Sequence, residues 1–409
     1  MTLQIFKKAE GSSPASNIAE IFMDTVDNKI KSKDYNGVVT ILSDKDSRSA
    51  NIIMNGGLSI QQRVATASTA ITGVSTTTRA GVVADRWAVT TSVATNLNWQ
   101  QVDTNGAEES NLISRFYGSI ISSTAGKKVM LSEWIINREC AHLKGKKVRL
   151  TVKIRQKVGT TGQLYKIGLL QLNVSGTIDV SPAFLSGAWS ATTGVDPSWG
   201  KNLAAITPQS TGALNGTVTG SYLNITTTAG WTKYSVVFTC PTNFKNLIPV
   251  VFADATGGTT DNISFAEFGL YLGEDDVDWQ EPPFSVELAK CQAYYCKTFA
   301  YGTVPAQNAG ANTGEAKLIA GKAGAVANAG FIFWRFPVTM WKTPVTVTTY
   351  NPAAANAQVR DLTATVDHSA TTAATQLDSS VRFTSTGNAS TAVGDEIGLH
   401  ITADAEIVA

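Results

Sequence analysis

The feature that most constrains this chain is the alternation of apolar and polar residues in short segments, without any long helical pattern. In Lys147–Arg155, the residues Val148, Leu150, Val152 and Ile154 occupy every second position. A period of two places them on one face of a half-buried antiparallel strand. Other strand-like segments recur at Arg86–Thr91, Val129–Ile136, Leu164–Val174, Tyr234–Thr239, Leu247–Phe252 and Ile263–Leu272. Turns rich in Gly, Asn, Thr and Pro separate them, so the pattern predicts a mainly β fold with a central β-sandwich of the jelly-roll type.

The chain divides into three predicted parts: a short hairpin unit at residues 1–50, the sandwich at residues 51–285, and a β-rich module with one short helix at residues 286–409. The two prolines of Glu281–Phe284 cannot continue a strand ladder, so this segment is predicted to be a linker. Near-helical spacing of Leu288, Cys291, Tyr295 and Phe299 predicts the short helix at Glu287–Phe299. Strands are expected after it at Gly314–Ala320, Gly330–Phe336, Val345–Tyr350, Val381–Thr384 and Glu396–Asp404.

Composition and charge limit the kinds of molecule that the chain is expected to bind and the compartment in which it is made. The 409 residues carry a net charge of +1, and charged residues make up 16%, below the usual share of about 25%. Nucleic-acid binding needs a concentrated basic patch and is not expected. No apolar run reaches the roughly 20 residues of a membrane helix, and no apolar leader follows Met1, so we expect synthesis in a cytoplasm without membrane insertion. The four cysteines have no framework spacing and are predicted to be free thiols.

Three short motifs stand out. Asn51–Arg63 contains Asn-Gly followed by Gln-Arg, Asp85–Trp87 reads Asp-Arg-Trp, and Glu287–Lys297 reads Glu-Leu-Ala-Lys-Cys-Gln-Ala-Tyr-Tyr-Cys-Lys. Together they resemble the modular structural proteins of tailed bacteriophages, in which the first two motifs open a sandwich domain and the third opens the next module. The charged residues Arg63, Asp85 and Arg86 are predicted to form ion pairs that hold the fold, with ligand contact as the alternative.

Parts of the sandwich resemble carbohydrate-binding modules. Phe265–Gly273 is similar to the last strand of the carbohydrate-binding-module jelly rolls on phage tail proteins, although this chain has Leu270, Tyr271 and Leu272 where those proteins tend to have Gln, Leu and Glu. The resemblance implies a virion subunit, either a tail fibre or a head fibre or spike, that attaches to host-surface polysaccharide.

The N-terminal unit is expected to assemble with copies of itself. Asp24–Thr40 resembles a short hairpin repeated in phage fibre proteins, which are typically trimeric, and isolated hairpins are marginally stable. We therefore predict a homotrimer that also contacts other virion proteins through this unit. The residues predicted to line its axis are Ile18, Ile21, Phe22, Val26, Ile30, Val38, Val39 and Leu42.

Tryptophan suggests where a glycan could bind. Trp189 and Trp199 lie in Ser186–Lys201, a segment of small polar residues that also contains Asp196. Aromatic rings can pack on the C–H faces of sugars, and a carboxylate can accept hydroxyl hydrogen bonds. Trp99, beside three amide side chains, is a further candidate. The alternative for these rings is packing, either against the edge of the sandwich or against another subunit.

No catalytic signature is found, and the chain is not expected to be an enzyme. The histidines His142, His368 and His400 have no partner at metal-ligand spacing, so no metal or cofactor is predicted. The acidic run Glu274–Asp278 leaves a structural calcium open, with a solvated turn as the alternative. Scattered carboxylates keep a glycan depolymerase as one alternative function. A purely structural capsid head fibre or decoration protein is the other.

Overall fold

The structure of the chain is a computed structural model. It describes residues 7–8, 20–24, 30–33, 36, 39–41, 50–64, 69–74, 81–92, 95–104, 111–122, 127–159, 162–173, 184–258, 261–343, 345–368 and 370–406. These residues form a mainly β protein of antiparallel sheets with short helices, which confirms the predicted fold class.

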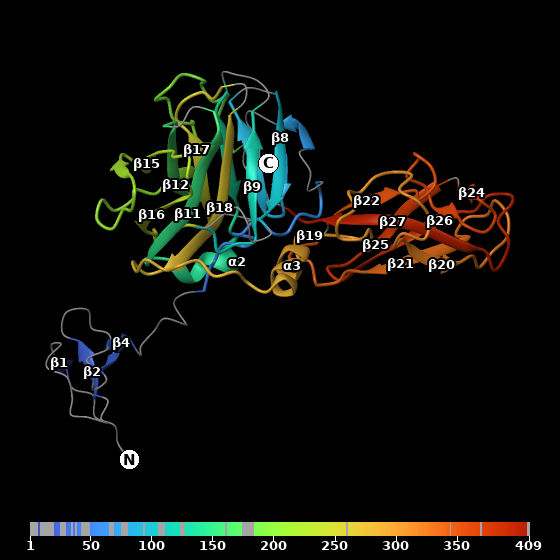
Figure 1. Cartoon of the computed structure of the whole chain (residues 1–409). Coiled ribbons are helices and arrows are strands. Elements are labelled where there is room, and N and C mark those ends of the chain that lie inside the picture. The colour runs from blue at the N-terminus through green and yellow to red at the C-terminus, as the bar shows by residue number, and fades with distance from the viewer. Residues whose placement is uncertain are drawn as a thin grey trace, which may run out of the picture.

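Two sheets face each other across the middle of the molecule (Figure 1). One consists, in spatial order, of β14 (Thr217–Thr219), β15 (Tyr222–Thr226), β12 (Leu164–Leu172), β17 (Asn246–Ala253), β10 (Val129–Glu133), β7 (Trp87–Thr91) and β6 (Gly81–Ala84), with β13 (Leu203–Ala205) beside β12. The other consists of β16 (Thr232–Thr239), β11 (Lys147–Val158), β18 (Asn262–Leu272), β9 (Phe116–Ile121), β8 (Thr95–Asp103) and β5 (Thr69–Val74). The short helices α2 (Asn137–Cys140) and η1 (Ala141–Leu143) follow β10.

The core between the sheets is built from the alternating residues of their strands. Val148, Leu150, Val152 and Ile154 of β11 are at most 1% exposed and belong to this core, as the sequence predicts. Trp87 of β7 is fully buried there and packs on Phe268 of β18, with ring centroids 4.2 Å apart. Burial of these side chains is the main favourable term for the sandwich.

A second apolar cluster covers the outer face of the first sheet. All eight residues of β17 are buried, because one face of the strand lies in the sandwich core and the other lies under the segment 184–205. Phe184, Trp189 and Leu203 of this segment pack there with Phe252. The continuous apolar run of β17, with no alternation, is typical of a strand that is covered on both sides.

The C-terminal strands extend to one side of the sandwich (Figure 1). One sheet contains β19 (Tyr295–Lys297), β27 (Glu396–Asp404), β23 (Arg360–Asp361), β24 (Val366–Asp367), β20 (Ala316–Ile319) and β22 (Thr346–Tyr350). The other contains β21 (Gly330–Arg335), β26 (Ser380–Thr386) and β25 (Ala370–Gln376). Ile397, Leu399, Ile401 and Ala403 of β27 are fully buried between them.

The predicted helix is shorter than expected and lies earlier in the chain. Helix α3 spans Phe284–Gln292, and the second half of the predicted segment contains the short strand β19 instead. Tyr295–Lys297 pairs with Thr402–Asp404 of β27. Backbone pairing with a strand more than 100 residues away therefore overrides the helical spacing, which is a weak local preference.

The N-terminal strands are β1 (Lys7–Lys8), β2 (Glu20–Asp24), β3 (Ile30–Lys33) and β4 (Val39–Ile41). The last three pair antiparallel in sequence order, with Asn36 in the turn between β3 and β4. Within the chain Phe22 is 2% exposed, whereas its neighbour Ile21 is 40% exposed. Of the other residues predicted to line a trimer axis, Ile18, Val26, Val38 and Leu42 lie outside the described residues, and only the backbone is described for Ile30 and Val39.

Candidate functional site

The three sequence motifs meet at one place, where the sandwich adjoins the C-terminal strands. Asn55 organises the first motif: its side chain donates to the carbonyls of Ile60 (2.8 Å) and Asp85 (2.9 Å) and accepts the N–H of Ile60 (2.8 Å). Its carbonyl accepts the indole N–H of Trp87 (3.1 Å). Its backbone N–H donates to Glu287, the first residue of the third motif. One asparagine thus ties all three motifs together.

Arginine side chains cross from the sandwich to the C-terminal end of the chain. Arg86 is fully buried, forms an ion pair with Glu406 (2.7 Å) and lies over the ring of Tyr294 (3.5 Å to the centroid). Arg63 forms an ion pair with Asp404 and lies over the ring of Tyr295 (3.7 Å). We call this contact the joint. On the sandwich side it comprises Asn55, Gln62, Arg63, Asp85 and Arg86, and on the other side Glu287, Tyr294, Tyr295, Asp404 and Glu406.

The joint confirms that Arg63 and Arg86 form ion pairs and adds that these pairs connect two parts of the molecule. Asp85 is different, because its carboxylate accepts from Gln62, through the backbone N–H (3.2 Å) and the side-chain amide (2.5 Å). Gln62 also donates to the carbonyl of Tyr295 (3.0 Å), 233 residues away. Burial raises the pKa of Asp85 to about 6, against the opposing effect of Arg63.

The raised pKa of Asp85 predicts a pH-dependent stability. In the folded protein the Asp85 carboxyl keeps its proton up to about pH 6. In the unfolded chain an aspartate carboxyl loses its proton near pH 4. The folded state therefore binds more protons in that window, and the free energy of unfolding should fall by roughly 3 kcal/mol as pH rises from 4 to above 6. Urea unfolding of wild type and Asp85→Asn at several pH values measures it. The difference between the two curves should slope only in this window, and a flat difference would contradict the assignment.

The two rings predicted to form a glycan platform, Trp189 and Trp199, instead pack against neighbouring side chains. Trp189 is 2% exposed, packs edge-on against Phe252 (5.8 Å between centroids) and donates its indole N–H to the carbonyl of Val195 (3.3 Å). Trp199 is partly exposed and donates to the hydroxyl of Tyr222 (2.8 Å). Both rings cover the outer face of the sheet. This arrangement agrees with the alternative in which the rings pack on the sandwich and do not contact a glycan.

The other two candidates also have structural partners. Trp99 is 1% exposed in the sandwich core and donates to Gln61 Oε1 (3.0 Å). It shares a buried face of β8 with Leu97 and Gln101. In the sequence only Leu97 marks this face as apolar, so the local pattern signals the burial of Trp99 weakly. Asp196 remains partly exposed and pairs with Lys166 (2.6 Å). The structure therefore does not bring these four residues together as one open surface.

Most of the polar groups that could support catalysis or metal binding are buried or already paired with other protein groups. His400 lies between the hydroxyls of Thr298 (3.0 Å) and Thr313 (2.9 Å), and burial lowers its pKa. Burial raises the pKa of the Cys140, Cys240 and Cys296 thiols to about 12, which keeps them protonated and weakly nucleophilic. In the run 274–278, Glu274 pairs with Lys147 and Asp276 with Lys233. Within the described residues, no group of three or more His, Cys, Asp or Glu side chains is arranged to hold a metal ion.

No helix among the residues that the structure describes is both long and apolar enough to cross a membrane.

Comparison with known proteins gives only distant likeness. No protein-family model and no curated protein matches the sequence. Among solved structures, the chain is similar to the enzymatically active domain of tailspike protein 4 from bacteriophage CBA120, with 12% identity and a TM-score of 0.30 over 55% of this chain and 21% of that one.

Two carbohydrate-binding modules are also similar. TmCBM61 in complex with β-1,4-galactotriose has 10% identity and a TM-score of 0.30, over 55% of this chain and 100% of that one. The C-terminal family 22 module of Clostridium thermocellum Xyn10B has 11% identity and a TM-score of 0.28, over 49% and 94%. The chain is therefore distantly similar in structure to carbohydrate-binding modules and to a phage tailspike domain. Structural similarity at this level carries no conclusion about activity.

Proposed function

We propose that the chain is a subunit of a phage fibre or spike that displays its sandwich domain to glycans on the host surface. The observation that supports this proposal is the joint. The motifs that resemble phage structural modules are used there to fasten one module to the next, through Asn55, Arg86 and Glu287. When the most distinctive residues of a chain fix one module against the next, the chain is suited to displaying a domain in a set orientation.

The physical character of the joint favours a fixed geometry. Arg86 and Glu406 are both 0% exposed at their side chains. Separation of the two parts would leave buried charges without their partners, which is costly. The sandwich is therefore held in one orientation relative to the C-terminal module, and sites on several copies would face a surface together. Linked sites of this kind gain avidity without stronger individual contacts.

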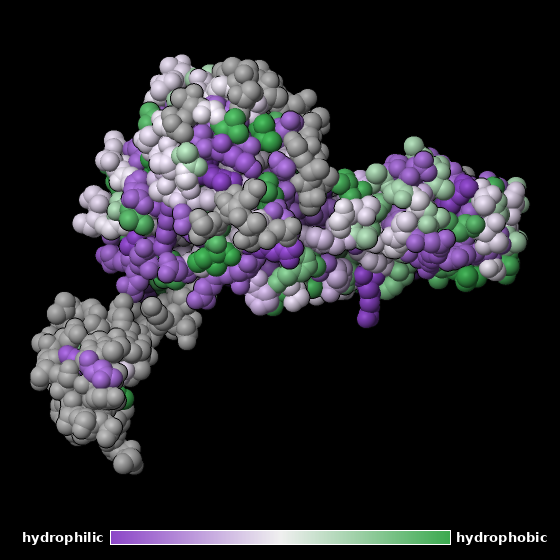
Figure 2. Space-filling model, in the orientation of Figure 1, coloured by the Kyte–Doolittle hydropathy of each residue, from purple (hydrophilic) through white to green (hydrophobic). Residues whose placement is uncertain are grey.

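Trimeric assembly is part of the proposal, with one refinement from the N-terminal strands. Consecutive strand residues point to opposite faces, so Ile21, the exposed member of its pair, is the better candidate for contact with another copy than the buried Phe22. On β21, Phe331 (43% exposed) and Phe333 (55%) also face outward, and Figure 2 shows hydrophobic residues on the surface of the C-terminal module. Sedimentation at micromolar concentration should give the mass of a trimer, and a monomer would contradict this part.

Glycan binding is tested directly with the full chain. The protein is immobilised and exposed to purified bacterial surface polysaccharides, and to the short oligosaccharides derived from them. We expect one polysaccharide to bind, and the dissociation rate to be slower when the protein is in its assembled form than when it is diluted to monomers. Absence of binding to any host-surface polysaccharide would favour the alternative of a purely structural head fibre or decoration protein.

The enzymatic alternative is separated in the same experiment. A reducing-end assay on the bound polysaccharide detects hydrolysis, because each cleaved glycosidic bond releases one new reducing end. The proposal predicts binding without a time-dependent increase in reducing ends. A steady increase would identify a depolymerase, and the carboxylate responsible could then be sought by substitution.

A further inference from the structure

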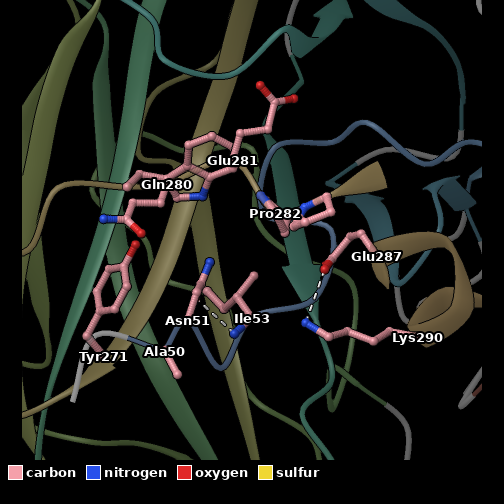
Figure 3. Close-up of a pocket in the computed structure, with 12 residues that line it drawn as sticks. Ala50, Asn51, Ile53, Tyr271, Gln280, Glu281, Pro282, Glu287 and Lys290 are labelled. Atoms are coloured by element: carbon pink, nitrogen blue, oxygen red, sulfur yellow. Dashed lines mark hydrogen bonds and ion pairs between the residues drawn. The ribbon is translucent and has the colours of Figure 1, made fainter. Parts of the chain in front are cut away.

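A cavity of about 340 Å³ lies beside the joint and shares Glu287 with it (Figure 3). Its walls come from four segments: the start of the first motif at Ala50–Gly56, the end of β18 at Tyr271, the segment Trp279–Pro283, and helix α3. Its volume falls in the range of about 300–1,000 Å³ that is typical of small-molecule sites. None of the residues predicted from the sequence to bind glycan lines this cavity.

Two aromatic residues that line the cavity have buried donors without a protein partner. Tyr271 is 2% exposed and Trp279 is 4% exposed. Neither the Tyr271 hydroxyl nor the Trp279 indole N–H has a hydrogen-bond partner among the residues that the structure describes. Leaving such a group unsatisfied costs about 1–3 kcal/mol. By contrast, the indoles of Trp87, Trp99 and Trp189 all donate to protein acceptors.

These donors are held in place by the surrounding backbone. A Cβ on Gly57, the second glycine of the first motif, would lie 3.0 Å from the Trp279 ring, so the absence of a side chain there lets the ring pack closely. The Tyr271 ring lies over Gly269 of the same strand in the same way. Burial, with the nearby carboxylate of Glu267, raises the pKa of Tyr271, so its hydroxyl keeps its proton and can donate.

Hydrogen-bond acceptors line the same cavity. Gln280 and Glu281 line the cavity (Figure 3) and are exposed. The Glu281 carboxylate accepts the backbone N–H of Arg115 (3.2 Å). An ionised carboxylate offers about four acceptor positions, so it can take further donors. Glu287 also lines the cavity, with Lys290 3.2 Å from its carboxylate. Two carboxylates against one ammonium group disfavour an anionic ligand.

We propose that this cavity binds a neutral sugar residue, whose hydroxyl oxygens accept from Tyr271 and Trp279 and whose hydroxyl protons are donated to Glu281 and Gln280. A sugar supplies acceptors, donors and C–H groups within one small ring, which matches a cavity lined by aromatic rings and amide or carboxylate oxygens. This inference rests on the proposed function, because it assigns a site to the glycan-binding role.

The test observes Trp279 directly. The full chain is labelled with 5-fluorotryptophan, and the ¹⁹F signal of Trp279 is assigned by its loss in Trp279→Phe. Galactose, glucose and N-acetylglucosamine are titrated separately to millimolar concentration, with glucuronate as the anionic comparison. We expect the Trp279 signal to shift in a saturable way with at least one neutral sugar, and more weakly with glucuronate.

Tyr271→Phe is the matched variant, because it removes only a hydroxyl that has no protein partner and should not disturb the fold. It should weaken sugar affinity roughly tenfold, the effect of one lost hydrogen bond of ordinary strength. Tyr350→Phe removes a hydroxyl in the C-terminal module, outside this cavity, and should leave the affinity unchanged. A Trp279 signal that responds to none of the neutral sugars overturns the proposal, as does equal affinity in wild type and Tyr271→Phe.

The two proposals can fail separately. If wild type binds a polysaccharide while the Trp279 signal stays unmoved, glycan display stands and the cavity is not its site. If the Trp279 signal responds to a free sugar while no surface polysaccharide binds, the cavity is a sugar site and the display function is wrong.

Discussion

Replacing Arg86 with Ala should destabilise the protein by about 3–5 kcal/mol, the range for removing one partner of a buried ion pair. Glu406 and Glu133 would keep their buried carboxylates while losing the guanidinium that faces both, at 2.7 Å and 3.9 Å. The Tyr294 ring would lose the cation that lies over it. Urea unfolding measures the loss of stability. Limited proteolysis with chymotrypsin measures opening of the joint, which should expose the buried Tyr294 and Tyr295 to cleavage.

Arg115→Ala is the matched control. Arg115 also forms an ion pair, with Asp103 at 2.8 Å, but its side chain is 60% exposed. Exposed pairs contribute little because water and salt screen them, so this variant should unfold with wild type. If the two variants lose equal stability and their cleavage patterns match, Arg86 does not hold the joint.

Trp189→Ala should destabilise the sandwich by about 3–5 kcal/mol, because it removes a large buried ring and leaves a cavity over β17. The ring contacts Phe252 and anchors its loop through the carbonyl of Val195. Thermal unfolding of the full chain measures the effect. Polysaccharide binding should decline only as the folded fraction declines.

Val195→Ala tests the same loop without removing the anchor. The residue is 42% exposed, and its carbonyl, which accepts from Trp189, is retained. We expect a change within about 0.5 kcal/mol, as for other surface substitutions. If Trp189→Ala instead keeps its stability and loses polysaccharide binding, the ring is a glycan contact after all, and the loop must open to expose it.

Much of the fold could be predicted from local pattern. The strand limits expected at Glu396–Asp404 are those of β27, and those expected at Lys147–Arg155 fall within β11. Alternation is a property of neighbouring residues, so it is visible without the rest of the chain. Alternation marks the face of Trp99 only through Leu97, because the next residue on that face, Gln101, is polar although it is buried.

The candidate site could be predicted only in part. Sequence motifs identified Asn55, Arg86 and Glu287 as members of distinctive segments, but not as partners of one another. The cavity beside them was not predicted, because Tyr271 and Trp279 are separated from the first motif by more than 200 residues, and only folding brings them to one cavity with Asn51 and Gly56.

What the sequence by itself determined is the strand pattern, the mainly β class and the presence of ionic residues in the phage-like motifs. Tertiary structure alone decided which partners those residues have and which aromatic rings are covered. Arg86 finds Glu406 because β27 returns to the sandwich, and Trp189 is buried because the outer face of β17 is apolar and needs a cover. Ion pairing and burial depend on distances between residues far apart in the chain, and a local pattern carries no such distance.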